Sequence, residues 1–307
     1  MTNEELQKAV KILLAGGLVA FPTETVYGLG AVSTNDKAVA SIYELKGRPS
    51  FNPLIAHVDG PEMAEKYVEV TPVARQLMDA FWPGPLTLVL KRKASCPVSY
   101  LASAGLDTLA VRMPNNPIAL KLITGTGIPI VAPSANPSGR ISPTTAEHVA
   151  TSFGEKAPMI LDGGSCSVGV ESTVLLATDK TPVMLRYGGL SVDDIEDLVG
   201  PIIRPEKDPN APQSPGQMKS HYAPTIPLRM NALEADPGEA LLGFGPAPQA
   251  VLNLSEKEDL KEAAANLFSM MRQLDNGKYT GIAVMPIPMH GLGLAINDRL
   301  KRASYKK

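Results

Sequence analysis

Two cations, Lys46 and Arg48, stand two residues apart beside Gly47 and Pro49. A lysine acts as a mobile point charge and an arginine as a flat fork, so together they suit a polyanion such as a triphosphate. The same pair also fits the solvated end of a helix, where cations interact favourably with the helix dipole. The cluster therefore indicates a phosphate site as one hypothesis and leaves the helix end as the other.

Two further candidates come from apolar, strand-like stretches. His57 lies within residues 54–58, and Arg112 lies within residues 109–113. An arginine in a buried strand needs a partner, because removing its charge from water is costly. A substrate carboxylate would be such a partner, and an internal Asp or Glu would serve equally. A lone histidine among apolar residues is also compatible with a satisfied position in the core.

Hydroxyl side chains gather in three loops. Residues 22–30 combine threonines with glycines, residues 133–144 are rich in serine and threonine, and Ser172 precedes a strand-like stretch. Ser142 followed by Pro143 fits the first turn of a helix. Hydroxyls and helix N-termini also bind anions, so contact with phosphate or ribose is the functional alternative. Arg186 ends a strand-like stretch and could stabilise charge at a reacting phosphate.

Alternating helical and extended patterns over the first 200 residues must position these side chains. Helices are expected at 4–15, 36–46, 72–81, 116–124, 143–153 and 191–198, and strands at 18–21, 54–58, 86–90, 109–113, 128–132, 159–161 and 174–177. This mixture predicts an α/β domain with a twisted sheet, whose ligands lie in loops at strand ends.

The rest of the chain divides into a linker and a smaller unit. Seven prolines interrupt residues 201–227, which predicts a linker, because proline lacks a backbone donor and disfavours regular structure. Strands are then expected at 240–244, 250–254 and 281–286, with helices at 257–273 and 292–302. The predicted organisation is a catalytic domain at 1–200, a linker at 201–227 and a small α/β domain at 228–307.

Composition limits the class of protein. The 307 residues carry a net charge of −2, so a strongly basic nucleic-acid binder is not supported. Two cysteines without a Cys-x-x-Cys spacing argue against a disulfide framework and a zinc site. The first residues are acidic, and no apolar run approaches the ~20 residues of a membrane span. These features predict a cytoplasmic protein without membrane association.

Taken in order, the motifs resemble those of the YrdC-type domain. They are PTETVYGL at 22–29, KGRP at 46–49, NPLI at 52–55, WPGPLT at 82–87, VRMP at 111–114, PSANPSG at 133–139 and ESTV at 171–174. Residues 214–224, SPGQMKSHYAP, resemble the segment that joins this domain to the C-terminal domain of the longer, Sua-type synthases. The resemblance implies a twisted mixed sheet with a concave cavity and a small Rossmann-like C-terminal domain.

The resemblance also implies an activity and its partners. The family condenses L-threonine, bicarbonate or CO2, and ATP to threonylcarbamoyl-AMP and pyrophosphate. Downstream threonylcarbamoyl-transferase proteins then modify adenosine 37 of tRNAs that read codons beginning with A, so tRNA is an indirect partner. Mg2+ is expected with the ATP, and the sequence offers no obvious carboxylate cage for it.

Carried over by motif, the implied site has three overlapping groups. Catalytic roles fall to Lys46, Arg48 and Arg186. Threonine is expected to contact Thr25, His57, Arg112, Ala132 and Ser172. ATP is expected to contact Arg48, Asn52, Thr108, Ser134, Ser142, Arg186 and Tyr222. Because Tyr222 belongs to the linker, the linker is expected to close over the site as a lid that excludes water.

Two other functions compete with this one. An RNA-binding module without turnover would show salt-dependent RNA affinity, but the net charge and an aromatic content of 5% weigh against it. A carbamoyl-AMP-forming enzyme that uses carbamoyl phosphate has a similar domain. Such enzymes normally carry zinc-binding modules, for which this sequence lacks cysteine pairs.

Overall fold

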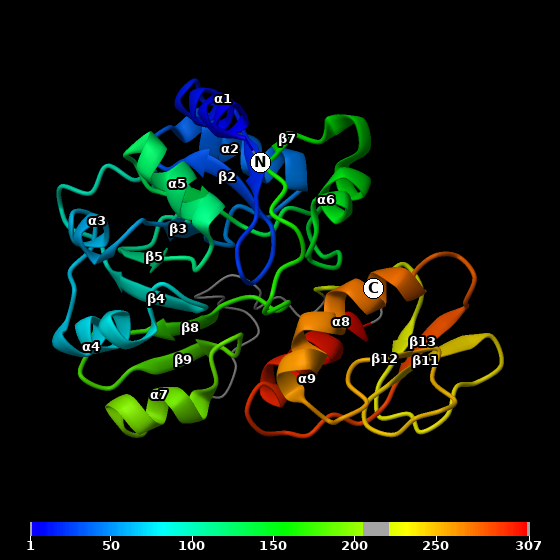
Figure 1. Cartoon of the computed structure of the whole chain (residues 1–307). Coiled ribbons are helices and arrows are strands. Elements are labelled where there is room, and N and C mark those ends of the chain that lie inside the picture. The colour runs from blue at the N-terminus through cyan, green and yellow to red at the C-terminus, as the bar shows by residue number, and fades with distance from the viewer. Residues whose placement is uncertain (1, 205–220, 306–307) are drawn as a thin grey trace.

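The computed structural model describes residues 2–204 and 221–305, and the first of these ranges builds a nine-stranded sheet (Figure 1). The strand order is β7-β1-β2-β6-β3-β5-β4-β8-β9. The strands are β1 Val19–Phe21, β2 Gly28–Val32, β3 Ile55–His57, β4 Leu86–Lys91, β5 Thr108–Arg112, β6 Ile130–Ala132, β7 Met159–Ile160, β8 Thr173–Leu176 and β9 Val183–Arg186. Since β3 runs parallel to β5 and antiparallel to β6, the sheet is mixed.

Helices lie on and around this sheet (Figure 1). They are α1 Asn3–Leu14, α2 Asp36–Lys46, α3 Pro61–Glu65, α4 Pro72–Phe81, α5 Pro117–Thr126, α6 Ala146–Phe153 and α7 Val192–Val199, with a short 3-10 helix at Gly154–Lys156. Their starts follow local chemistry. Thr2 and Glu5 form a capping box at α1, and Asn116 caps α5 with Pro117 at its first position.

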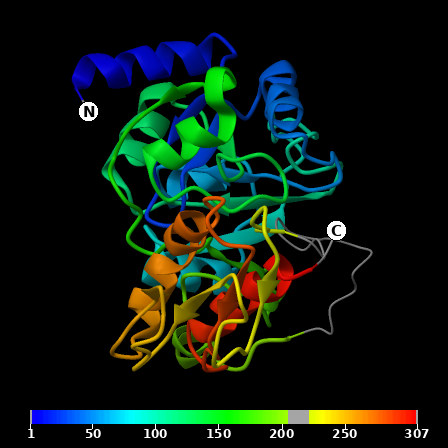
Figure 2. The same ribbon diagram turned by 90° about the vertical axis from the view of Figure 1, so that its right-hand side faces the viewer.

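The second unit is a four-stranded parallel sheet with two helices. Its order is β10-β13-β11-β12. The elements are β10 Leu228–Arg229, β11 Glu239–Gly243, β12 Leu252–Asn253, α8 Leu260–Leu274, β13 Gly281–Val284 and α9 Gly293–Ala303. Figures 1 and 2 show α8 and α9 between this sheet and the larger domain. Helices therefore form the face that the C-terminal domain turns towards its neighbour.

Two hydrophobic cores correspond to the two units. The larger core fills the nine-stranded domain. The second core packs α8 and α9 on the smaller sheet, and it also takes in Val26, Ile141 and Val170 from the larger domain. Apolar contact is therefore continuous across the domain interface, which favours a fixed relation between the two units.

The predicted fold class is confirmed, with a large mixed sheet and a second α/β domain. Strand β2 was not among the expected elements, because its sequence GLGAV carries two glycines that indicate a turn. The expected helix at 143–153 begins instead at Ala146 with Thr145 as its cap, so Ser142 has no capping role.

The predicted domain limits lie between the two sheets. The nine-stranded sheet ends at Arg186 and the four-stranded sheet begins at Leu228. Residues 205–220 of the predicted linker lie outside the described residues. Within 2–204 and 221–305, no helix has the length and apolar character needed to cross a membrane.

Candidate active site

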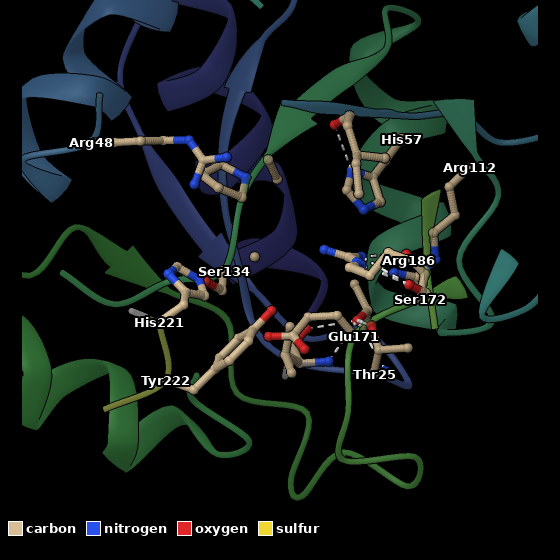
Figure 3. Close-up of a pocket in the computed structure, with 16 residues that line it drawn as sticks. Thr25, Arg48, His57, Arg112, Ser134, Glu171, Ser172, Arg186, His221 and Tyr222 are labelled. Atoms are coloured by element: carbon tan, nitrogen blue, oxygen red, sulfur yellow. Dashed lines mark hydrogen bonds between the residues drawn. The ribbon is translucent and has the colours of Figure 1, made fainter. Parts of the chain in front are cut away.

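Most of the predicted site residues line one pocket (Figure 3). They are Thr25, Arg48, His57, Arg112, Ala132, Ser134, Ser172, Arg186 and Tyr222. Thr23, Glu171 and His221 also line this pocket. Residues from eight separate stretches of sequence thus meet in one cavity.

The register of three strands explains how the pocket is assembled. In the parallel pair, His57 of β3 lies opposite Arg112 of β5. In the antiparallel pair, Ile55 at the start of β3 lies opposite Ala132 at the end of β6. Ser134 lies two residues after Ala132, so β3, which carries His57, lies between Arg112 on β5 and the strand β6 that leads to Ser134.

Arg112 forms a buried ion pair inside the protein. Its Nη2 lies 2.7 Å from Oε1 of Glu24, and the two side chains are 4% and 5% exposed. Its Nε donates a hydrogen bond to the carbonyl of Gly84 at 3.2 Å. The contact with Glu24 is close enough for a strong ion pair. An internal carboxylate thus balances Arg112, which is one of the two partners that its sequence left open.

His57 is a neutral imidazole in this site. Its Nδ1 lies 3.2 Å from the carbonyl of Ile55 and 3.3 Å from that of Ile130, and carbonyls only accept. Nδ1 therefore carries the proton, and Nε2 keeps a lone pair for the pocket. Burial, reinforced by the charge of Arg112, lowers the pKa of His57 to about 3. The ring can accept a hydrogen bond from a ligand hydroxyl or amine.

The end of helix α2 determines the position of Arg48. Gly47 terminates the helix in a left-handed conformation with φ of 58°, and Arg48 follows it into the pocket. Its Nε and Nη2 donate to the carbonyls of Asn52 and Pro53 at 3.1 and 2.9 Å. Burial is the main cause that lowers the pKa of Arg48 to about 10, so the side chain stays cationic at neutral pH. A buried cation held by carbonyls is suited to an anionic ligand.

Arg186 and Ser172 form a second polar group. Arg186 donates to the carbonyl of Ser172 through Nε at 3.1 Å and through Nη2 at 2.9 Å. The hydroxyl of Ser172 is 2.7 Å from that of Thr87, which fixes its orientation. Burial lowers the pKa of Arg186, and its guanidinium remains a second cation of the pocket.

His221 and Tyr222 close the pocket from the second described segment. Tyr222 has a φ of 61°, a strained value for a tyrosine, and its ring is fully buried. The two rings contact edge to face at 4.2 Å, and Tyr222 stacks on Phe268 of α8 at 5.4 Å. The part of the expected lid that the structure describes therefore lies in the pocket and against the C-terminal domain.

Four predicted residues do not line the pocket. Lys46 is buried behind the loop that carries Ser134, and its Nζ donates to the carbonyls of Ser134 at 2.5 Å and of Asn136. Burial, and then the charge of Arg48, holds the pKa of Lys46 well below its usual range. Lys46 thus supports the loop from behind, and a direct catalytic contact has no geometric support here.

The other three are Asn52, Thr108 and Ser142. The carbonyl of Asn52 accepts the bond from Arg48 Nε. Extending the β3–β5 register places Thr108 level with Pro53, beside the same loop. Ser142 donates its hydroxyl to Oε1 of Glu171 at 2.6 Å, and Glu171 lines the pocket. Asn52 and Thr108 therefore lie beside Arg48 or its loop, and Ser142 lies beside Glu171. The contacts of all three with ATP stay predictions.

Sequence reasoning missed Glu24, Glu171 and Arg299. Both glutamates occur in quoted motifs, but nothing in the sequence indicates which arginine each one meets. Arg299 lies in the C-terminal domain, more than a hundred residues from its partner Glu171. Only the three-dimensional fold brings these charges together.

The sequence led us to expect Mg2+ with the ATP, without a carboxylate cage in the protein. Among residues 2–204 and 221–305, no group of three or more His, Cys, Asp or Glu side chains could hold a metal ion. The carboxylates beside the pocket, Glu24 and Glu171, are each paired with an arginine. The described residues therefore do not form a carboxylate cage for Mg2+.

Comparison with known proteins identifies the family. The family model described as Telomere recombination, Sua5_yciO_yrdC, matches residues 11–188. A second model, described as the C-terminal domain of threonylcarbamoyl-AMP synthase, matches residues 190–304. Together the two models span both domains of this chain.

Three individual proteins support this match. The threonylcarbamoyl-AMP synthase of Bacillus subtilis is 42% identical over 99% of this chain and 94% of its own length. The crystal structure of Pyrococcus abyssi Sua5 complexed with L-threonine superposes with a TM-score of 0.91, is 39% identical, and covers 99% of this chain and 95% of that one. The crystal structure of Escherichia coli YciO matches 61% of this chain and 90% of its own with a TM-score of 0.56 at 26% identity. The chain therefore belongs to the threonylcarbamoyl-AMP synthase family of enzymes.

Proposed function

We propose that this protein condenses L-threonine, bicarbonate or CO2, and ATP to threonylcarbamoyl-AMP and pyrophosphate. The observation that carries the proposal is the pocket that brings together Arg112 of β5, His57 of β3 and Ser134 just after β6, with Arg48 and Arg186 also in its lining. One cavity therefore offers groups for an amino acid and for a polyanion side by side.

Arg112, His57 and Ser172 form the threonine half of the proposal. The arginine fork suits a carboxylate, and the lone pair on Nε2 of His57 suits the threonine hydroxyl or amine. Thr25 is fully buried, and its hydroxyl is 2.8 Å from that of Thr23, so it is pre-oriented. The solved Pyrococcus relative with L-threonine supports this substrate.

Arg48, Arg186, Ser134 and Tyr222 form the nucleotide half. Buried guanidinium groups stabilise phosphate charge more strongly than exposed ones, because water screens them less. Asn52 and Thr108 lie beside Arg48 or its loop, and Ser142 contacts the pocket residue Glu171, which supports their proposed part in ATP binding. Lys46 contributes indirectly by supporting the Ser134 loop.

The proposed chemistry needs positioning more than a covalent intermediate. The threonine amine attacks CO2, loses a proton and becomes a carbamate. A carbamate oxygen then attacks the α-phosphorus of ATP, and the bond to the β-phosphate oxygen breaks with release of pyrophosphate. Holding the two reactants together and neutralising the developing phosphate charge supply the rate enhancement.

Mg2+ enters this proposal only with ATP. The described residues lack a carboxylate cage, so phosphate oxygens and water would provide most of its ligands. The metal would reduce the charge of the triphosphate. Every step above is carried by the residues of the chain.

The product is a mixed anhydride that hydrolyses readily, so a second protein must consume it quickly. We propose threonylcarbamoyl-transferase proteins as these partners, with adenosine 37 of tRNAs reading codons that begin with A as the final acceptor. ATP and tRNA both occur in the cytoplasm, where we propose that the enzyme acts. RNA binding without turnover has no observation of its own in its favour.

The experiment is direct detection of the product. Purified protein is incubated with ATP, Mg2+, L-threonine and carbon-labelled bicarbonate, and the mixture is analysed by mass spectrometry. We expect an adenylate that carries both the labelled carbon and the threonine. Formation of AMP and pyrophosphate without this species would contradict the proposal.

A further inference from the structure

Arg299 belongs to α9 of the C-terminal domain, yet its guanidinium reaches into the larger domain. The side chain is fully buried. Its Nε donates to Oε2 of Glu171 at 2.9 Å, and its Nη1 donates to the carbonyl of Tyr187 at 2.8 Å. Because a buried charge is retained only with good partners, these contacts tie the two domains together at one point.

Glu171 connects this point to the pocket. One carboxylate oxygen meets Arg299, and the other accepts the hydroxyl of Ser142 at 2.6 Å. Burial alone would raise the pKa of Glu171, but Arg299, Arg186 and the Ser142 hydroxyl outweigh it and hold the pKa below its usual range. Glu171 is thus a charged residue in the wall of the pocket, and its ion-pair partner comes from the other domain.

The bond to Glu171 also determines what Ser142 can do. A serine hydroxyl has one hydrogen, and here Glu171 receives it. Ser142 can then only accept from a ligand. Phosphate oxygens cannot donate, whereas ribose hydroxyls and the adenine amino group can.

Tyr222 is held by the same arginine. The guanidinium carbon of Arg299 lies 5.3 Å from the centre of the Tyr222 ring. A second contact comes from Phe268 of α8, whose ring stacks on Tyr222 at 5.4 Å and 26°. Two residues of the C-terminal domain therefore hold this strained tyrosine in place.

Apolar packing supports the same loops. Three larger-domain residues share the core of the C-terminal domain, and each directly neighbours a residue of the site. These residues are Val26 beside Thr25, Ile141 beside Ser142, and Val170 beside Glu171. The C-terminal domain is thus packed against the segments that carry the site.

We propose that Arg299 is a positioning residue for the nucleotide half of the pocket: through Glu171 it fixes Ser142 as an acceptor for the ribose or adenine of ATP, and it also helps to hold Tyr222 at the pocket. This inference rests on the proposed function for the identity of the nucleotide. It gives the C-terminal domain a defined part in ATP binding. Without Arg299, the Glu171 charge would also face the polyanionic ligand unbalanced, and like charges repel.

The test measures binding to the full-length chain by calorimetry, with α,β-methylene-ATP and L-threonine as separate ligands. We expect Arg299→Met to weaken binding of the nucleotide by at least roughly tenfold, as is typical when a bond to a charged group is lost. Threonine binding should change by less than about threefold, because no threonine contact is involved. Arg299→Lys should recover part of the nucleotide affinity, since it keeps the charge but not the fork.

Arg272 of α8 provides the matched control. It crosses the same interface and donates to the carbonyls of Ile141 and Ser142 and to Ser152 Oγ at 3.1 Å, so it contacts the backbone of Ser142 but forms no ion pair with Glu171. In a double-mutant cycle on nucleotide affinity, Arg299→Met and Glu171→Gln should be strongly non-additive, whereas Arg272→Met and Glu171→Gln should be nearly additive. Equal coupling in the two cycles would overturn the inference.

Breaking a buried ion pair can prevent folding, so a second variant is needed. The double variant Arg299→Met with Glu171→Gln removes both charges and should fold. Its nucleotide affinity should remain at least roughly tenfold below wild type, because nothing then holds residue 171. Wild-type affinity in this folded variant would overturn the inference.

The two proposals fail separately. Absence of threonine-dependent turnover in the wild type would contradict the proposed function and leave the binding comparison intact. Normal turnover in the wild type together with unchanged nucleotide affinity in both Arg299 variants would overturn only the role of Arg299.

Discussion

The guanidinium of Arg112 meets the carboxylate of Glu24 at 2.7 Å, with both side chains almost fully buried. The pair balances the charge of Arg112 before any substrate enters. A substrate carboxylate therefore joins, or partly replaces, an existing partner. The proposed threonine half of the pocket thus contains an ion pair, to which a substrate carboxylate would add a second anion.

Glu24→Gln should make folding more dependent on threonine. Removing one member of a buried ion pair costs about 3–5 kcal/mol, because the other charge remains unpaired. A threonine carboxylate on Arg112 would restore the missing charge, so added L-threonine should raise Tm more in this variant than in the wild type. The measurement is thermal unfolding with and without threonine, with the exposed Glu147→Gln as control. An equal rise in both proteins would speak against carboxylate binding at Arg112.

Arg112→Ala should affect the two substrates unequally. Loss of a buried charged hydrogen bond costs about 2–5 kcal/mol, which corresponds to an increase of roughly 30-fold or more in the KM for threonine. The KM for ATP should change by much less. Arg92→Ala is the control, since Arg92 is a buried arginine of the same domain that does not line the pocket. Equal changes in both KM values would contradict the assignment.

His57 should make stability fall as the pH is lowered. Burial lowers the pKa of His57 to about 3, whereas an unfolded histidine titrates near 6.5. Between these values the unfolded chain binds a proton that the folded protein does not, so stability is complete above about pH 6.5 and is lost towards pH 3. The contribution of His57 to this slope approaches roughly 1.4 kcal/mol per pH unit.

Urea unfolding of His57→Gln at pH 7, 6 and 5 measures this contribution. The variant should show a shallower decline of unfolding free energy with falling pH than the wild type. Other histidines keep part of the slope, because burial also lowers the pKa of His221 to about 3. An unchanged slope in the variant would mean that His57 is not a buried neutral group.

Gly169 lies against α8 of the C-terminal domain, so a substitution there tests how closely the two domains pack. It has a φ of 75°, and a Cβ at this position would lie 2.5 Å from the carbonyl oxygen of Ala264 in α8. Gly164 has a similar φ of 77° but open space around it. Gly164→Ala should therefore cost about 1–2 kcal/mol from backbone strain alone, and Gly169→Ala clearly more.

Thermal unfolding of the two glycine variants separates the effects. The Tm of Gly169→Ala should fall further than that of Gly164→Ala, and its nucleotide affinity should fall as well, because α8 supports Tyr222 through Phe268. Equal values of Tm would show that the domains do not pack closely at this point.

The sequence predicted the fold where hydrophobic patterns were long. Helices such as α4 and α7 and the buried strands β4 and β5 were expected close to their observed limits. Strand β2 was missed because its glycines resemble those of a turn. Ser142 followed by Pro143 resembled a helix start, but Thr145 caps the helix. The hydroxyl of Ser142 donates a hydrogen bond to Glu171 instead. Local patterns cannot decide between two uses of the same side chain.

The sequence predicted which residues line the site but not the ion pairs that connect them. Motif order indicated Arg48, His57 and Arg112, which line the pocket together. The counter-charges were not predictable, because Glu24 meets Arg112 and Glu171 meets Arg299 only through tertiary contacts. Ion pairs between distant segments depend on strand register and domain packing, which a single sequence does not specify.

The most direct measurement is pyrophosphate release from ATP in the presence of bicarbonate, with each of the twenty amino acids added in turn. A pocket that binds an amino acid beside ATP predicts release that depends on both bicarbonate and L-threonine, with the other amino acids much less effective. Release at the same rate without any amino acid, or none with L-threonine, would contradict the account.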